Sequence, residues 1–233
     1  MRSDLFSRAV SATPAAPFAL ETPRMLRVRV NGQMYAKQGA MVAYRGRVDF
    51  AHKGQGAGGF IKKALTGEGQ DLMTVSGDGE VYFADFGEAL FVLHLEDDQL
   101  IVNGRNVIAF EGSVQYSIQR TKGGAGGVFG GGFFSTVLQG RGGVCISSMG
   151  DPILIPTDTE VFVDRDAVLA WSGGVQTDVR STFKLGALVG RSSGELFQMR
   201  LQGAGGFVLV QAGEPFTGGG SAGSGGIGGL LSG

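Results

Sequence analysis

The sequence lacks the features that mark secreted and membrane-spanning proteins. Its 233 residues include one cysteine, Cys145, so no disulfide can form within the chain, and a reducing compartment is the simpler expectation. No apolar run approaches the ~18 residues of a membrane-spanning helix. Residues 1–10 carry charges at Arg2, Asp4 and Arg8, which do not suit a secretory signal. We therefore expect a cytoplasmic protein whose contact with a membrane would only be peripheral.

The chain also lacks an excess of charge of either sign. It contains 20 Lys and Arg against 21 Asp and Glu, which gives a formal net charge of -1. Domains that bind nucleic acid through its phosphates usually carry a clear basic excess. We therefore expect no DNA partner.

No catalytic or metal-binding pattern is present either. His52 and His94 stand far apart in the sequence, and with one cysteine they form no spaced set of metal ligands. Residues 190–194 fit the nucleophile-elbow pattern of hydrolases, but both histidines precede the serine and the hydrolase order is the reverse. Residues 54–59 match a dinucleotide fingerprint, which glycine-rich sequences produce by composition. The sequence predicts a protein that is not an enzyme, with no catalytic, cofactor-binding or metal-binding residues and no cofactor.

The remaining polar candidates have ordinary structural interpretations. The densest acidic groups, at residues 96–98 and 164–166, are typical of solvated turns, with a weak cation or partner site as the alternative. Cys145 lies between Val144 and Ile146 in a strand-forming run and has no basic neighbour in sequence. We interpret it as a small structural residue.

Glycine is what the chain has in excess. Its 43 glycines are about 18% of the residues, against a typical ~7%, and they do not recur at every third position as in collagen. Residues 217–233 are almost all Gly, Ser and Ala, which predicts a flexible tail. Residues 1–22, with alanine and proline at 12–17, form a lead-in segment, so residues 23–216 are expected to be one domain.

Three short sequence boxes each occur three times in this domain. The aromatic box reads aliphatic, Ala, aromatic, any residue, Gly, any residue, Val. The glycine box opens a strand-forming run, and a third box begins ten residues after it. The aromatic boxes span 42–48, 108–114 and 169–175, the glycine boxes 77–81, 140–144 and 203–207, and the third boxes 87–89, 150–152 and 213–215. Nearly constant spacing of three ordered boxes predicts an internal repeat.

Within each repeat the pattern is that of antiparallel strands. Apolar and basic residues alternate over 26–30, and Asn31-Gly32 predicts a two-residue hairpin turn, as does Asn103-Gly104. The glycine of each aromatic box suggests a positive φ or a bulge. The aromatic residues Tyr44, Phe110 and Trp171 are predicted to pack in the core. Three such β units should close around a pseudo-threefold axis, which gives an all-β domain.

The order of these boxes, with strand runs such as residues 106–116 and segments such as 64–69, resembles the AIM24 family of mitochondrial-biogenesis-like proteins over residues 24–216. The resemblance implies the β fold of the tryptophan RNA-binding attenuation protein (TRAP), related to double-stranded β-helices, and a tendency to oligomerise. It implies no activity. The mitochondrial member of the family is linked to inner-membrane organisation.

Two functional hypotheses remain. The first is a non-catalytic, oligomeric β scaffold or adaptor, with other copies of the chain and further proteins as partners and a link to membrane organisation or a stress response. The second is a small-molecule or RNA-binding module with a TRAP-like fold, since fold alone does not decide function.

Overall fold

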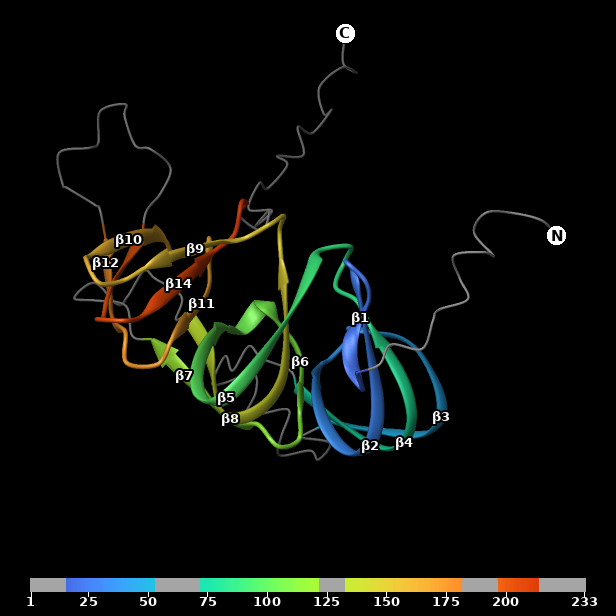
Figure 1. Cartoon of the computed structure of the whole chain (residues 1–233). Coiled ribbons are helices and arrows are strands. Elements are labelled where there is room, and N and C mark those ends of the chain that lie inside the picture. The colour runs from blue at the N-terminus through green and yellow to red at the C-terminus, as the bar shows by residue number, and fades with distance from the viewer. Residues whose placement is uncertain (1–15, 53–71, 122–132, 182–196, 214–233) are drawn as a thin grey trace, which may run out of the picture.

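The computed structural model describes residues 16–52, 72–121, 133–181 and 197–213, and these are nearly all in β-strands (Figure 1). The strands are β1 (Phe18–Thr22), β2 (Met25–Lys37), β3 (Met41–His52), β4 (Leu72–Phe83), β5 (Ala89–Asn103), β6 (Val107–Glu111), β7 (Gln115–Thr121), β8 (Phe133–Ser148), β9 (Ile153–Pro156), β10 (Val161–Asp164), β11 (Val168–Ser172), β12 (Gln176–Ser181), β13 (Phe197–Gln202) and β14 (Phe207–Val210). A short 3-10 helix, η1 (Gly104–Asn106), follows β5. The predicted all-β class is confirmed. Across the described ranges no helix is long and apolar enough to cross a membrane.

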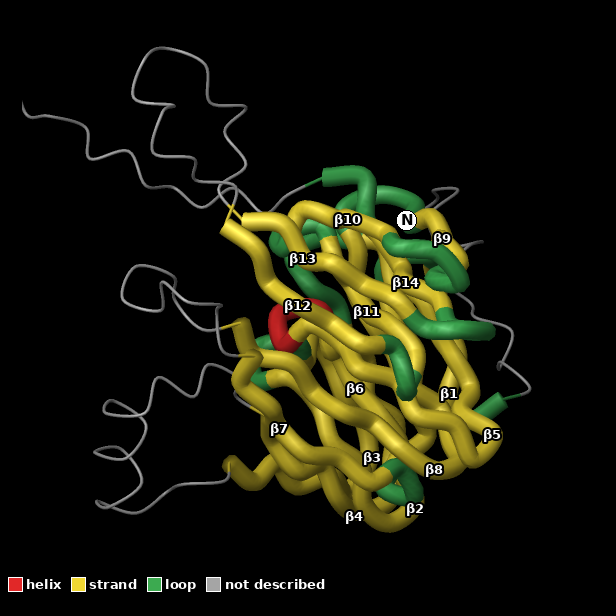
Figure 2. The backbone as a smooth tube through the Cα atoms, turned by 90° about the vertical axis from the view of Figure 1, so that its left-hand side faces the viewer, coloured by secondary structure: helices red, strands yellow, loops and turns green. Residues whose placement is uncertain are grey.

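The strands form two sheets. The larger has the order β3-β4-β2-β6-β8-β5-β11-β14-β9, with β1 added to β2 and β7 added to β8, and the smaller has the order β10-β13-β12. All pairings are antiparallel. β2, β3 and β4 lie at one end of the molecule, and β10 and β12 lie at the opposite end (Figures 1 and 2).

The glycine box lets long strands cross at close range. A Cβ atom on Gly77 would lie 2.1 Å from the carbonyl oxygen of Arg47, and one on Gly79 would lie 2.3 Å from that of Arg45. Gly46 of the aromatic box, with φ +97°, pairs with Gly79 in this crossing. The predicted positive φ is thus found at Gly46. No side chain could replace these glycines without moving the backbone of β3 or β4.

A register shift precedes the aromatic residue of each aromatic box. It falls between Met41 and Ala43 on β3, between Val107 and Ala109 on β6, and between Val168 and Ala170 on β11. A bulge at this position turns the strand locally. The same irregularity therefore occurs at matching positions of three strands far apart in the sequence.

The buried residues form three apolar clusters. One lies around β1, β2 and β4, one around β5, β6 and β8, and one around β10, β11, β13 and β14. Phe110 is 0% exposed and Trp171 is 4% exposed, as predicted for core residues. The prediction for Tyr44 is wrong, because its exposure is 52%. β3 pairs only with β4, so no described strand covers this part of its outer edge, whereas β6 and β11 each lie between two strands.

The predicted hairpin turns are also wrong. Asn31 and Gly32 lie inside the continuous strand β2 and pair with Asp78 and Gly77. Gly32 has φ +105°, so its freedom is used within the strand instead of in a turn. Asn103 caps η1, its side-chain oxygen accepting a hydrogen bond from the backbone N–H of Arg105 at 3.2 Å.

β1 lies within the segment that the sequence assigns to the lead-in, and it is a strand of the larger sheet. Phe18 is buried and pairs in register with Val28. The predicted tail, residues 217–233, lies outside the described residues.

Candidate functional site at the strand junctions

Two antiparallel junctions join strands that are distant in the sequence. The first junction pairs β2 with β6, with Met34 opposite Glu111, Tyr35 opposite Phe110 and Ala36 opposite Ala109. Its centre is aromatic: the rings of Tyr35, Phe110 and Tyr116 have centroids 4.9 to 5.2 Å apart. Such contacts add to the stability gained from burying the rings.

The second junction pairs β5 with β11. Leu100 lies opposite Ser172, Ile101 opposite Trp171 and Val102 opposite Ala170. The backbone N–H of Gly173 also donates a hydrogen bond to the carbonyl oxygen of Gln99 at 2.7 Å. The aromatic residue of an aromatic box thus lies at the centre of both junctions.

The glycine of the aromatic box is required where the neighbouring strand passes. A Cβ atom on Gly112 would lie 2.2 Å from the carbonyl oxygen of Gln33 at the first junction. A Cβ atom on Gly173 would lie 2.8 Å from the Cβ of Gln99 at the second. These two glycines do not have a positive φ, so close approach of the neighbouring strand explains them better than turn geometry.

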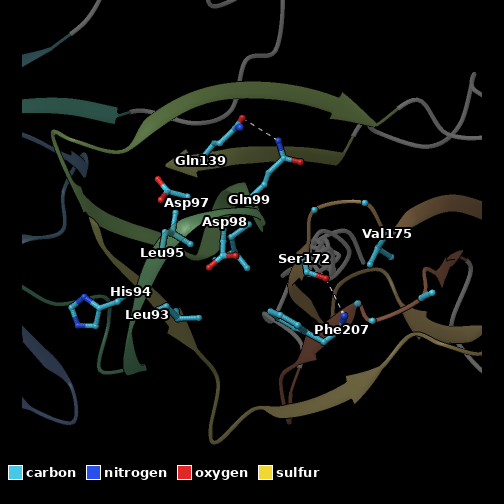
Figure 3. Close-up of a pocket in the computed structure, with 16 residues that line it drawn as sticks. Leu93, His94, Leu95, Asp97, Asp98, Gln99, Gln139, Ser172, Val175 and Phe207 are labelled. Carbon is cyan, nitrogen blue, oxygen red and sulfur yellow. Dashed lines mark hydrogen bonds between the residues drawn. The ribbon is translucent and has the colours of Figure 1, made fainter. Parts of the chain in front are cut away.

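A pocket of about 760 Å³ lies beside the second junction (Figure 3). One wall is the bulged middle of β5, and the other is formed by the turns that follow β11 and precede β14. Its lining residues are Leu93, His94, Leu95, Asp97, Asp98, Gln99, Leu100, Gln139, Ser172, Gly173, Gly174, Val175, Ala204, Gly205, Gly206 and Phe207.

This pocket occupies the place that β1 fills at the first junction. There, β1 pairs Ala19 with Arg27 and Phe18 with Val28, and the ring of Phe18 packs where a Cβ atom on Gly143 would lie. The β5 residues that correspond to Arg27 and Val28, 66 positions further along, are Leu93 and His94. Both line the pocket. The second junction therefore leaves open a space that the first junction fills with a strand.

The polar groups of the pocket mostly serve the local backbone. The hydroxyl oxygen of Ser172 accepts a hydrogen bond from the N–H of Phe207 at 3.0 Å (Figure 3). Asp98 accepts one from the N–H of Glu96 at 3.2 Å, and Asp97, with φ +69°, forms an ion pair with Arg141. Residues 96–98 thus form a bulge within β5 and not the predicted turn, and they give the pocket an acidic wall.

The second acidic group has the predicted turn chemistry. Between β10 and β11, Asp164 accepts a hydrogen bond from the N–H of Asp166 at 2.8 Å, and Asp166 pairs with Arg105 at 2.5 Å. Within the described part of the chain no group of three His, Cys, Asp or Glu residues could hold a metal ion.

Cys145 is fully buried between β5 and β6, opposite Val92 and Ala109. Burial raises the pKa of its thiol, with a backbone hydrogen bond at Phe91 acting weakly in the opposite direction. The thiol is therefore neutral at physiological pH, which is the structural role expected of this residue. The elbow-like residues 190–194 and the glycine-rich residues 54–59 lie outside the described residues, as does the side chain of His52.

Buried charges elsewhere have partners on neighbouring strands. Glu80 of β4 binds Arg45 of β3 at 2.5 Å and lies 3.7 Å from Arg27 of β2. Asp85 accepts hydrogen bonds from Lys37 at 2.8 Å and from Ser147 at 3.0 Å. These contacts tie strands together and do not form a reaction site.

The fold and its junctions define an all-β protein in which aromatic-box strands meet their neighbours in a recurring register. The chain belongs to the mitochondrial biogenesis AIM24 family, whose model matches residues 19–213. Its structure is similar to the crystal structure of protein SPYM3_0169 from Streptococcus pyogenes, with a TM-score of 0.68 and 23% sequence identity over 84% of this chain and 92% of that one. At this identity the likeness shows the fold alone. No curated protein matches the sequence.

Proposed function

We propose that this protein is a non-catalytic, oligomeric β scaffold of the cytoplasm, whose partners are other copies of itself and further proteins. The observation that supports the proposal most is the exposure of β3. Val42 and Tyr44 are about half exposed there, whereas the corresponding residues of the other two aromatic boxes are buried. Large apolar side chains in a row on an edge strand favour association with another strand.

The chemistry of the described residues supports the same proposal. The pocket beside the second junction has an exposed histidine and two carboxylates, but its serine hydroxyl is engaged by the backbone. A catalytic site needs a nucleophile or a metal placed beside a base. A scaffold needs only stable surfaces that recur on each copy, and a link to membrane organisation or to a stress response would act through such surfaces.

The test is the mass of the full chain in solution. Size-exclusion chromatography with light scattering at micromolar concentration should give a multiple of the chain mass. A strict monomer under these conditions would contradict the proposal.

A second candidate function, binding of a small molecule, is favoured by the pocket alone. Its volume suits a small ligand, and its acidic wall at Asp97 and Asp98 disfavours RNA. Trp171 lies next to the lining residue Ser172, so its fluorescence is a suitable reporter. Titration with a panel of amino acids, and with RNA pools at low salt, tests this candidate. No change at millimolar ligand removes it.

A further inference from the structure

The two junctions use one spacing rule. From the first junction to the second, Tyr35 is replaced by Ile101, 66 residues on, and Phe110 is replaced by Trp171, 61 residues on. The aromatic residues of the boxes are spaced by the same two steps, 66 from Tyr44 to Phe110 and 61 from Phe110 to Trp171. The strands that form junctions therefore follow the spacing of the sequence boxes.

The same rule places one further strand on each side. A step of 61 from Ile101 reaches Phe162 in β10, and a step of 66 back from Phe110 reaches Tyr44 in β3. The register of β10 supports the first assignment. Phe162 lies opposite Arg200 of β13, and Ile101 lies opposite Val137 of β8, 63 residues earlier, which is the spacing of the glycine boxes.

Both assigned residues are exposed at edge strands. Tyr44 is 52% exposed and Phe162 is 49% exposed, whereas Ile101 is only 9% exposed. β3 ends the path of the larger sheet, and β10 ends that of the smaller one. The molecule thus presents one half of a junction on each of two strands.

The two halves lie too far apart to meet within one molecule. Both views place β3 and β10 at opposite ends of the structure (Figures 1 and 2). A strand that fits β3 must therefore come from another molecule, and β10 of a second copy has the matching register.

The aromatic residues of β3 are already arranged as at the first junction. The rings of Tyr44 and Phe50 have centroids 5.2 Å apart, and those of Phe110 and Tyr116, 66 residues on, are also 5.2 Å apart. At the first junction Tyr35 of the neighbouring strand contacts both rings of its pair. Phe162 of a second copy would take the place of Tyr35 against Tyr44 and Phe50.

We propose that β10 of one copy pairs antiparallel with β3 of the next, with Phe162 opposite Tyr44, Val161 opposite Arg45 and Val163 opposite Ala43. This inference rests on the proposed oligomeric scaffold and names its interface. Each copy offers one strand of each kind, so the contact is head-to-tail and builds a ring or a filament. It buries the exposed apolar residues and satisfies both strand edges by backbone hydrogen bonds.

Cysteine cross-linking tests the register. Directly opposed residues of antiparallel strands have Cβ atoms about 4.5 to 5.5 Å apart, close enough for a disulfide to form with small adjustments. The double variant Tyr44→Cys/Phe162→Cys should give a ladder of covalent oligomers on mild oxidation. A mixture of the two single variants should give a covalent dimer, and each single variant alone should stay monomeric on a non-reducing gel.

The matched control pairs Tyr44→Cys with Ile118→Cys, an exposed residue of β7, and should give no cross-link. Cys145 is buried and should not contribute. Light scattering of each variant separates the two proposals. An oligomer without the 44–162 cross-link, or with a cross-link in a single variant, overturns the head-to-tail register and leaves the scaffold proposal standing. A monomeric wild-type chain overturns both.

Discussion

Tyr35 of β2 and Phe110 of β6 stack across the first junction, with ring centroids 5.2 Å apart and ring planes 29° apart. This contact joins segments separated by most of the first third of the chain. It is also the pattern from which the interface between copies is inferred, so the energetics of the aromatic boxes can be tested within one chain and between chains.

Removing a buried aromatic side chain should be costly. We predict that Phe110→Ala and Trp171→Ala each lower the free energy of unfolding by about 3 to 5 kcal/mol, because each leaves a cavity in a packed core. The exposed Arg47→Ala should change it by less than about 1 kcal/mol. Chemical denaturation at one fixed protein concentration measures all three. A near-neutral Trp171→Ala that abolishes assembly or ligand binding would show that this aromatic faces a functional surface.

Tyr44 should behave differently from the other two aromatic residues. Tyr44→Lys should leave the strand content seen by circular dichroism unchanged and lower the mass measured by light scattering, since it places a charge at the proposed interface. Ile118→Lys is the matched control, an exposed apolar residue on a strand outside the interface. Equal masses for both variants would argue against a role for Tyr44 in assembly.

The glycines at the junctions should tolerate no side chain. Gly112→Ala should destabilise the protein by more than about 2 kcal/mol, because its Cβ would lie 2.2 Å from the carbonyl oxygen of Gln33 and the backbone would have to move. Gly213→Ala, whose nearest neighbour would be 3.6 Å away, should change stability by less than about 1 kcal/mol. Thermal melts of the two variants give the comparison, and equal melting temperatures would contradict it.

The buried thiol predicts a dependence on alkaline pH. Burial raises the pKa of Cys145 above its ordinary value of 9.0, so above that pH the unfolded chain loses the thiol proton while the folded chain keeps it. Stability should therefore fall with rising pH by up to about 1.4 kcal/mol per pH unit from this group. Denaturation between pH 9 and 11 should show a shallower fall in Cys145→Ala. Identical slopes would mean that the thiol ionises in the folded state.

Much of the fold can be predicted from the sequence because the repeated boxes record positions where backbones meet. The aromatic box predicts Phe110 and Trp171 in the core, and the glycine box predicts a conformation or contact that only glycine allows. Tyr44 has the same local sequence, but its exposure depends on which strand lies beside β3. That is a property of the strand order, so local sequence cannot reveal it.

The hairpin predictions failed for a related reason. Asn31-Gly32 favours a turn locally, yet β2 continues because Gly32 pairs with Gly77 and both adopt positive φ within the strands. The pocket beside the second junction was likewise not predictable, because its walls come from β5 and from two distant turns. Its signal in the sequence is indirect: no segment before β5 repeats the pairing of Phe18 with Val28.

The most direct test of the account is amide hydrogen exchange on one edge strand after a change on the other. In the wild-type chain, residues 42–46 of β3 should exchange slowly at micromolar concentration, because β10 of a second copy covers them. Phe162→Lys, at the opposite end of the molecule, should make these amides exchange rapidly while β8 stays protected. Unchanged exchange of residues 42–46 in the variant would contradict the pairing of β10 with β3 between copies.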